Sequence, residues 1–282
     1  YRHLELYYAA PCSGAVLHTA NFRLFPEQLA YIVNHAADKV LFIDPDVLPA
    51  VEAIAGELKT VQRFVVLGTR EELPAITLPV EAYEDLLAAA SPSYRFPEDL
   101  DENSPAAMCY TSATTGNPKG MMYSHRTLYL HTAMQSMADS SAISERDTIM
   151  PVVPMFHANA WGLPWSAGFN GSRLVLPGPR PDPRAVAGLI QEERVTLAAG
   201  VPTIWLGVLD LFRAGERFDF SSIRCFVVGG SAVPRALLEA YDELVGAPIL
   251  QGYGMTEGGP LTHVGRLRAN TDGLDADNRY RM

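Results

Sequence analysis

Cysteine is scarce in this chain, and no long apolar run interrupts it. Only three cysteines occur among 282 residues, and their wide separation excludes the paired spacings of zinc and redox motifs. We therefore expect free, mostly buried thiols in a reducing compartment, and hence a cytoplasmic location. The longest apolar stretch, residues 195–212, contains a proline, two threonines and an aspartate. It therefore disfavours a membrane-spanning helix.

Positive charge is also sparse. The formal net charge is −10, and no basic run occurs. Because nucleic-acid-binding proteins carry a basic patch, we expect no nucleic-acid partner. Hydrophobic residues make up 48% of the chain, which is typical of a globular protein with a sizeable core. The sequence begins at Tyr1, in the middle of a pattern, and we expect a fragment of a longer protein.

Short apolar runs alternate with helical patterns, which favours an α/β fold with mainly parallel, buried strands. Helices are predicted to begin at Pro26, Pro202 and Pro234, because each proline precedes apolar residues at helical spacing. The proline-rich, acidic segment 91–105 is predicted to be a surface linker. It divides a leading subdomain, residues 1–92, from a second, residues 93–282. Strands are predicted at residues 40–44, 64–68, 106–112, 148–153, 173–177, 195–199, 224–229 and 248–253.

The most informative segment is 110–120, Tyr-Thr-Ser-Ala-Thr-Thr-Gly-Asn-Pro-Lys-Gly. It follows an apolar run and combines hydroxyls, glycines and one ammonium. Oriented backbone amides and a point positive charge suit phosphate oxygens. The segment is not a Walker loop, because no Gly-Lys-Ser/Thr closes it; a Ser/Thr-rich surface turn is the alternative. The candidate phosphate ligands are Thr111, Ser112, Thr114, Thr115, Gly116 and Lys119.

Two further segments carry glycines beside predicted strands. Residues 251–257, Gln-Gly-Tyr-Gly-Met-Thr-Glu, provide an aromatic face at Tyr253 and a carboxylate at Glu257. A carboxylate near a triphosphate is the kind of ligand that Mg²⁺ takes, although such a run can also form an ordinary turn. Residues 229–234, Gly-Gly-Ser-Ala-Val-Pro, join a strand to a helix. Close packing alone is the alternative for this pair of glycines.

A third cluster, residues 154–161, reads Pro-Met-Phe-His-Ala-Asn-Ala-Trp. His157 and Trp161 are four residues apart, so they share one face if a helix begins here. A histidine satisfied in the core and a tryptophan that only packs are the alternatives. His125 follows the candidate phosphate loop at the predicted start of a helix, which it could cap. The remaining histidines show no ligand spacing, and no role is assigned to them: His3, His18, His35, His131 and His263.

Segment 110–120 resembles the phosphate loop of the adenylate-forming superfamily, which comprises acyl-CoA synthetases, luciferases and peptide-synthetase adenylation domains. Ala113 stands where that signature has its first glycine. Residues 155–162, Met-Phe-His-Ala-Asn-Ala-Trp-Gly, are similar to the medium- and long-chain fatty acyl-CoA synthetase branch, which includes the methylmercaptopropionate ligase. The resemblance implies the large-domain α/β fold of this superfamily, incomplete at both ends.

The resemblance also implies residue roles. Tyr253 would stack on adenine, Thr256 would contact the α-phosphate, and Glu257 would hold Mg²⁺ together with Thr111. The implied catalytic residues are Thr256, Glu257, Lys119 and His157. The implied nucleotide-binding residues outside the phosphate loop are Gly229, Gly230, Ser231, Ala232, Gln251, Gly252, Tyr253, Gly254, Met255 and Thr256. The implied acyl-site residues are His157, Gly200, Val201, Pro202 and Trp161, with the indole of Trp161 gating an acyl tunnel.

The implied activity is that of an AMP-forming acyl-CoA synthetase in fatty acid metabolism. A fatty acid or related carboxylate, ATP with Mg²⁺, and CoA would give acyl-CoA, AMP and pyrophosphate through an acyl-adenylate. The ribose-binding Asp and the C-terminal Lys of the family would follow Met282, so we expect this fragment to be inactive alone. The resemblance also allows a homodimer of the intact enzyme.

Two alternatives remain open. A degenerate, non-catalytic nucleotide-binding chain is motivated by Ala113 and by the family elements that the sequence does not contain. An aryl- or amino-acid-activating adenylation enzyme would need a polar anchor in its acyl pocket, and none is identified in the sequence.

Overall fold

The computed structural model describes residues 1–73, 75–111, 116–267, 269–271 and 273–280. The chain divides into two compact units, residues 1–125 and 126–282, and each contains its own sheets. The division predicted from the sequence, between residues 92 and 93, is a different one and stays a prediction. The segment that motivated it is exposed over residues 91–103 and has neither helix nor strand there.

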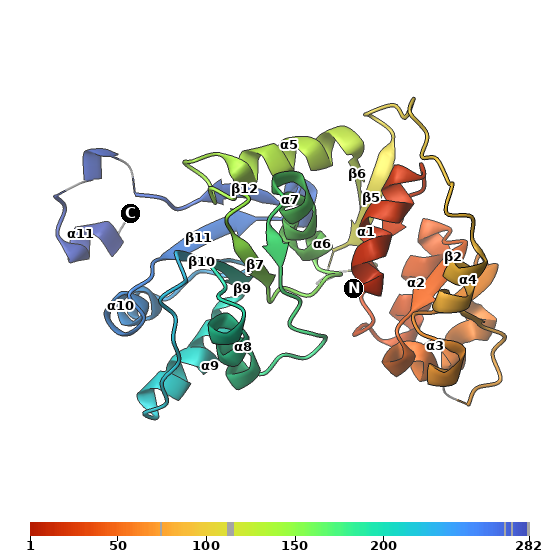
Figure 1. Cartoon of the computed structure of the whole chain (residues 1–282), viewed down its shortest axis with the longest axis horizontal. Coiled ribbons are helices and arrows are strands. Elements are labelled where there is room, and N and C mark those ends of the chain that lie inside the picture. The colour runs from red at the N-terminus through yellow and green to blue at the C-terminus, as the bar shows by residue number, and fades with distance from the viewer. Residues whose placement is uncertain (74, 112–115, 268, 272, 281–282) are drawn as a thin grey trace. The chain divides into compact units, whose positions relative to one another are not determined.

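The first unit contains two three-stranded sheets (Figure 1). In one, β1 is parallel to β5, and β5 is antiparallel to β6. In the other, β2, β3 and β4 are parallel neighbours. The strands are β1 (Leu17–His18), β2 (Val40–Ile43), β3 (Arg63–Val66), β4 (Glu81–Ala82), β5 (Pro105–Tyr110) and β6 (Gly120–Ser124). The helices are α1 (Arg2–Cys12), α2 (Pro26–Ala36), α3 (Leu48–Ile54) and α4 (Tyr83–Ala89).

The second unit is built on one six-stranded sheet in the order β12-β11-β10-β9-β7-β8. Its strands are parallel except β12, which is antiparallel to β11. The strands are β7 (Thr148–Pro151), β8 (Arg173–Leu174), β9 (Leu197–Gly200), β10 (Cys225–Val228), β11 (Ile249–Gly254) and β12 (Leu261–Val264). The helices are α5 (His125–Ser136), α6 (Ala158–Trp161), α7 (Leu163–Asn170), α8 (Pro183–Glu192), α9 (Pro202–Arg213), α10 (Arg235–Leu244) and α11 (Ala276–Tyr280).

Helices cover both faces of this sheet: α8, α9 and α10 pack on one face, and α5 and α7 lie on the other (Figure 1). The central strands β9 and β10 are buried at every position, as the continuous apolar runs predict. Trp205 of α9 and Tyr241 of α10 both lie edge-on to Phe226 of β10, with ring centroids 4.8 and 5.0 Å from it. Each fully buried aromatic ring of this kind contributes about 1.5–3 kcal/mol through the hydrophobic effect.

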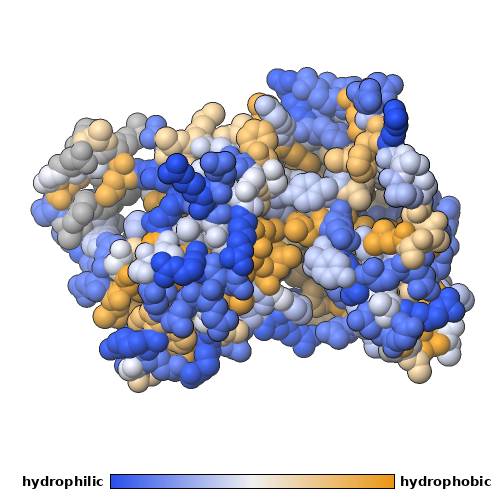
Figure 2. Space-filling view, in the orientation of Figure 1, coloured by the Kyte–Doolittle hydropathy of each residue, from blue (hydrophilic) through white to orange (hydrophobic). Residues whose placement is uncertain are grey.

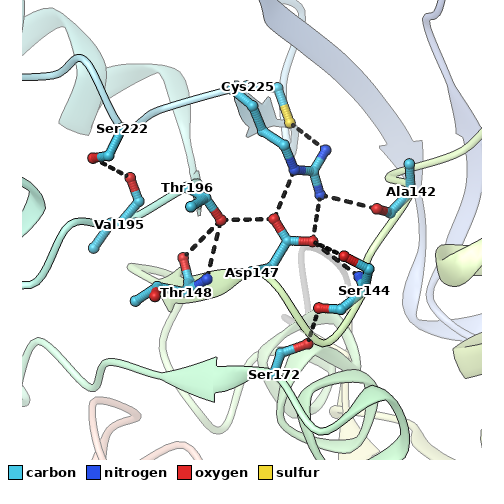
Figure 3. Close-up of polar contacts among 10 residues, drawn as sticks. Ala142, Ser144, Asp147, Thr148, Ser172, Val195, Thr196, Ser222 and Cys225 are labelled. Carbon is cyan, nitrogen blue, oxygen red and sulfur yellow. Dashed lines mark hydrogen bonds and ion pairs between the residues drawn. The ribbon is translucent and has the colours of Figure 1, made fainter.

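Three polar residues connect the central strands at their amino ends, and we call them the amino-edge cluster (Figure 3). Asp147 directly precedes β7, Thr196 precedes β9 and Arg224 precedes β10. Asp147 accepts hydrogen bonds from Arg224 Nε at 2.7 Å and Nη2 at 3.0 Å, and from Thr196 Oγ1 at 2.6 Å. One carboxylate thus joins three neighbouring strands.

Burial opposes ionisation of Asp147, which is 5% exposed. The hydrogen bonds from Arg224 and Thr196 and the backbone N–H of Ser144 outweigh that desolvation, so the pKa of the carboxyl lies below its usual value. The charged form is therefore the one that the fold stabilises.

The molecular surface in view is mainly hydrophilic, with apolar residues in separate patches (Figure 2). Within the described residues, no helix has both the length and the apolar character needed to cross a membrane. Cys109 and Cys225 are buried and Cys12 is exposed, and all three are free thiols. The prediction of free, mostly buried cysteines is confirmed.

Candidate functional site

Four of the segments singled out in the sequence follow neighbouring parallel strands of the second unit. Residues 154–161 follow β7, residues 200–202 follow from β9, residues 229–234 follow β10, and residues 252–257 end β11. Carboxyl ends of parallel strands meet at one edge of a sheet, where α/β proteins bind their ligands. This carboxyl edge is the end of the sheet opposite the amino-edge cluster.

Two glycines bring these segments into contact. A Cβ placed on Gly229 would lie 2.6 Å from the carbonyl oxygen of Gly252 and 3.4 Å from Cη2 of Trp161. One on Gly230, where φ is +82°, would lie 3.3 Å from Cγ1 of Val201 and 4.0 Å from Cζ2 of Trp161. The indole of Trp161 therefore lies against the Gly-Gly segment. Close packing at Gly229 and the positive φ at Gly230 both require glycine.

The segment that carries Trp161 is a left-handed helical turn. Ala158, Asn159, Ala160 and Trp161 have φ between 45° and 55°, and Gly162 follows with φ +74°. Left-handed backbone costs about 1–2 kcal/mol for each residue with a Cβ, so the turn is strained. The predicted shared face of His157 and Trp161 required a helix that includes both residues; His157 instead precedes the turn in extended conformation, with φ −87° and ψ 103°.

Side chains from α5 and α7 hold this turn in place. Gln135 is 1% exposed, and its Nε2 donates to the carbonyl oxygen of Trp161 at 3.0 Å. Ser166 of α7 donates from Oγ to Oε1 of Gln135. The amide of Gln135 thus uses its donor on the strained turn and its acceptor on a buried hydroxyl.

His131 lies one turn before Gln135 on α5 and contacts two parts of the site. Its Nε2 accepts a hydrogen bond from the backbone N–H of Leu261 at 3.2 Å, and Leu261 pairs with Gly254 across β11 and β12. On its other side, a Cβ at Gly162 would lie 2.7 Å from Nδ1 of the imidazole. The ring fills the space beside Gly162, and burial lowers its pKa to about 4.

This pKa predicts acid sensitivity. The pKa of His131 is about 4 in the folded chain, whereas the usual pKa of histidine is 6.5. Between pH 6.5 and pH 4 the imidazole is therefore protonated in the unfolded chain and neutral in the folded chain. The free energy of unfolding consequently falls as the pH falls. The expected loss from pH 7 to pH 4 is about 3 kcal/mol. His131→Gln, whose amide oxygen can accept the Leu261 N–H, should flatten this slope in urea unfolding.

The matched control for this experiment is His263→Gln, since His263 is an exposed histidine on β12. It should leave the slope between pH 7 and pH 4 as it is in the parent chain. Equal slopes in the parent and in the His131→Gln variant would contradict the assignment of a neutral, buried imidazole.

His157 precedes the turn, and its side chain is exposed at the carboxyl edge. Surrounding protein atoms still desolvate the imidazole and lower its pKa. A neutral imidazole can accept or donate a hydrogen bond without carrying a positive charge.

The 251–257 segment forms the end of β11 and a short turn at Thr256–Gly258. Tyr253 is 60% exposed, and its ring lies 5.9 Å from that of His263 on β12. Gly254 is required by packing, because a Cβ there would lie 2.3 Å from the carbonyl oxygen of Pro260. An exposed aromatic ring on a strand whose hairpin partner fixes it is suited to stacking on a flat base.

Glu257 is the one carboxylate of this segment, and it is exposed. Across the described ranges, no cluster of three or more His, Cys, Asp or Glu side chains could hold a metal ion. A single carboxylate fits Mg²⁺ that arrives with a nucleotide, because this ion keeps phosphate oxygens and waters as its other ligands. Ser231 and Ala232, also predicted to bind the nucleotide, are exposed beside Gly230.

The predicted phosphate loop belongs to the first unit, between the antiparallel strands β5 and β6. Its neck is closed by Thr111: the backbone N–H donates to the Lys119 carbonyl at 3.0 Å, and Oγ1 accepts from the Lys119 N–H at 3.2 Å. Gly116 has φ +80°, and Lys119 is exposed. The predicted ligands Ser112, Thr114 and Thr115, and the unusual Ala113, lie outside the described residues.

Sequence reasoning missed His131 and Gln135. Their spacing of four residues places them on one helical face, and Thr132 completes the buried residues of α5. A cluster of polar residues on the buried side of a helix can be detected only when the neighbouring apolar residues, Tyr129 and Leu130, are known to be exposed. The sequence alone favours the opposite orientation.

Known proteins resemble the chain throughout its length. A long-chain-fatty-acid–CoA ligase from Thermus thermophilus is 48% identical over 283 residues, covering 100% of this chain and 50% of that protein. A 3-methylmercaptopropionyl-CoA ligase from Ruegeria pomeroyi is 44% identical over 282 residues, covering 100% of this chain and 52% of that protein. The chain spans about half the length of the curated relatives that it matches.

The fold is also that of a solved ligase. The crystal structure of a long-chain-fatty-acid-CoA ligase from Archaeoglobus fulgidus aligns with a TM-score of 0.83 at 21% identity, covering 99% of this chain and 54% of that one. The family described as AMP-binding enzyme matches residues 1–280. With the predicted large-domain α/β fold present and nearly every residue matched, the chain belongs to the AMP-binding enzyme family.

Proposed function

We propose that this chain is the nucleotide- and acyl-binding part of an AMP-forming acyl-CoA synthetase. The observation that carries the proposal is the contact of Trp161 with Gly229 and Gly230 at the carboxyl edge. It joins the segment assigned to the acyl group with the segment assigned to the adenylate. The fatty-acid and methylmercaptopropionate ligases named among the relatives favour a straight-chain aliphatic carboxylate as substrate.

Each unit carries candidate nucleotide ligands of its own. Tyr253 offers an exposed ring for adenine, and Thr256 follows it at the end of the strand. Thr111 and Lys119 form the neck of the hairpin whose loop would surround the phosphates. Mg²⁺ bound with ATP would neutralise charge on the phosphate oxygens, and Glu257 is the residue that would hold it.

The first chemical step is difficult because a carboxylate must attack a phosphate that is also negatively charged. The exposed ammonium of Lys119 would offset that repulsion, and rigid positioning of the acid would orient it for attack. Attack of the carboxylate oxygen on the α-phosphorus breaks the bond to the leaving pyrophosphate and forms the acyl-adenylate. The CoA thiolate then attacks the acyl carbon, and AMP leaves.

The test uses a completed ligase, in which this chain is joined to the parts of the Thermus thermophilus relative that it does not cover. Pyrophosphate exchange and thioester formation are measured with straight-chain acids from acetate to palmitate, with benzoate and with amino acids. Activity confined to aliphatic acids is expected. Activity only with benzoate or amino acids would favour the aryl- or amino-acid-activating alternative. Nucleotide binding without turnover would favour a non-catalytic chain.

Trp161→Ala in the completed ligase tests the acyl assignment. Removal of the indole opens space beside Gly229 and Gly230, so the kcat/KM ratio of long to short acids should rise by about tenfold, the scale of one or two buried methylene contacts. The KM for ATP should stay within about twofold, because the adenine contacts are retained. An unchanged chain-length profile would make Trp161 a packing residue only.

A further inference from the structure

We propose that the buried polar face of α5, formed by Gln135 and His131, sets acyl-chain selectivity by holding the Trp161 turn in its left-handed conformation. The inference rests on the proposed function, since it assumes that Trp161 borders the acyl group. Neither residue is proposed to touch the substrate. Both are positioning residues that act through the backbone that carries the indole.

The first support is the orientation of α5. Its buried residues are polar, namely His131, Thr132 and Gln135, whereas Tyr129 is 60% and Leu130 52% exposed. Burial of polar groups costs free energy unless each one is hydrogen-bonded, and an apolar face would pack as well without that cost. A helix that buries its polar face therefore has partners that only polar groups can satisfy.

The second support is the identity of those partners. The Gln135 amide donates to the Trp161 carbonyl at 3.0 Å, at the last residue of four with positive φ. A left-handed turn of residues that carry a Cβ is not stable by itself, so tertiary contacts must fix it. Gln135 supplies one such contact, and Ser166 fixes Gln135 in turn.

The third support is the connection through His131 to the nucleotide side. Its ring occupies the space beside Gly162, the residue that follows Trp161. The same ring accepts the N–H of Leu261, which pairs with Gly254 in the hairpin of Tyr253. Helix α5 thus contacts both the turn that carries the indole and the hairpin proposed to bind adenine.

The experiment is a double-mutant cycle in the completed ligase. Gln135→Met keeps the side-chain length but removes the donor to Trp161. The long-to-short ratio of kcat/KM should change by about five- to tenfold, the factor that one buried hydrogen bond supplies. In the Trp161→Ala background the same substitution should change the ratio by less than about twofold, because the group through which Gln135 acts is gone.

Two further variants keep the test decisive. Ser166→Ala removes the hydrogen bond to Gln135 without changing Trp161. It should shift the long-to-short ratio in the same direction as Gln135→Met, by a smaller factor. If the Gln135→Met variant fails to fold, Ser166→Ala takes its place in the test. Ser136→Ala is the matched control: Ser136 neighbours Gln135 on α5 but bonds the Thr132 carbonyl and Asn170. It should leave the ratio unchanged.

The outcomes separate this inference from the proposed function. If Trp161→Ala leaves the chain-length profile unchanged, the acyl role of Trp161 fails. If Trp161→Ala shifts the profile but Gln135→Met and Ser166→Ala do not, the positioning role alone is overturned. An equal effect of Gln135→Met in both backgrounds would also overturn it, because the effect would then not pass through the indole.

Discussion

Glu257→Gln is expected to slow adenylate formation in the completed ligase by about two orders of magnitude, the scale of one lost preorganised electrostatic contact. The substitution keeps the size of the side chain and removes its charge. Since Glu257 is exposed at a short turn, its loss should leave folding unaffected. The effect should appear in kcat more than in the KM for ATP, because charge develops on the phosphates in the transition state.

The measurement is pyrophosphate exchange at saturating ATP across a Mg²⁺ titration. The matched control is Glu243→Gln, which neutralises another exposed carboxylate, on α10. The control should exchange pyrophosphate at the parent rate. Near-parent rates in the Glu257→Gln variant would show that Mg²⁺ is held without this residue.

Asp147→Ala is expected to give the largest loss of stability, about 3 kcal/mol in the free energy of unfolding, because it leaves Arg224 and Thr196 without their shared acceptor. This loss is at the low end of what breaking a buried ion pair costs, because the Arg224 side chain is 32% exposed and water can solvate part of it. Urea unfolding of the 282-residue chain, followed by the fluorescence of its tryptophans, measures the change.

A second paired carboxylate of the same unit provides the control. Glu216 accepts from both terminal nitrogens of Arg184 at the surface, where such pairs contribute about 0–1 kcal/mol. Glu216→Ala should therefore cost far less than Asp147→Ala, and equal costs would contradict the assignment. The pKa of Asp147 is lowered in the fold, so its contribution is present above about pH 4 and is lost as pH falls further.

Local pattern was sufficient to predict eight strands and three helices, but not the two-residue parallel strands β1 and β4. The helices at Pro26 and Pro202 begin at those residues, and Pro234 caps α10. The predicted strands all exist, although β8 ends at Leu174 and β5 at Tyr110. Continuous apolar runs identify buried parallel strands because both faces of such strands are covered.

The antiparallel strands β6 and β12 were not predicted. Strand β6 begins at Gly120, the last residue of the phosphate-loop motif, and β12 begins three residues after the Thr256–Gly258 turn. Both strands are short and half exposed, so they lack the apolar signal of the central strands. Their pairing depends on the hairpin geometry of the preceding loop rather than on their own composition.

The segments that meet at the carboxyl edge could be selected from the sequence, but their geometry could not be predicted. Resemblance selected the segments that meet beside Trp161, whereas nothing in Ala-Asn-Ala-Trp specifies four left-handed residues. Only Asn159 has a side chain that tolerates that region readily. The conformation is fixed by Gln135 and His131, which lie more than twenty residues earlier in the chain, and contacts of that kind cannot be recognised from a local pattern.

The amino-edge cluster lies at the end of the sheet away from the carboxyl-edge loops that we propose bind the ligands, and this separation has a consequence for mutational screens. Substitutions at Asp147, Thr196 or Arg224 should reduce the amount of protein that accumulates in a cell, while the molecules that do fold retain their specific activity. Substitutions at the exposed Glu257 should leave abundance unchanged and alter turnover. A screen that records abundance and activity separately would therefore place substitutions at the two edges of the sheet in different classes. Libraries intended to change acyl preference can vary the residues of the carboxyl edge while those of the amino edge are kept constant.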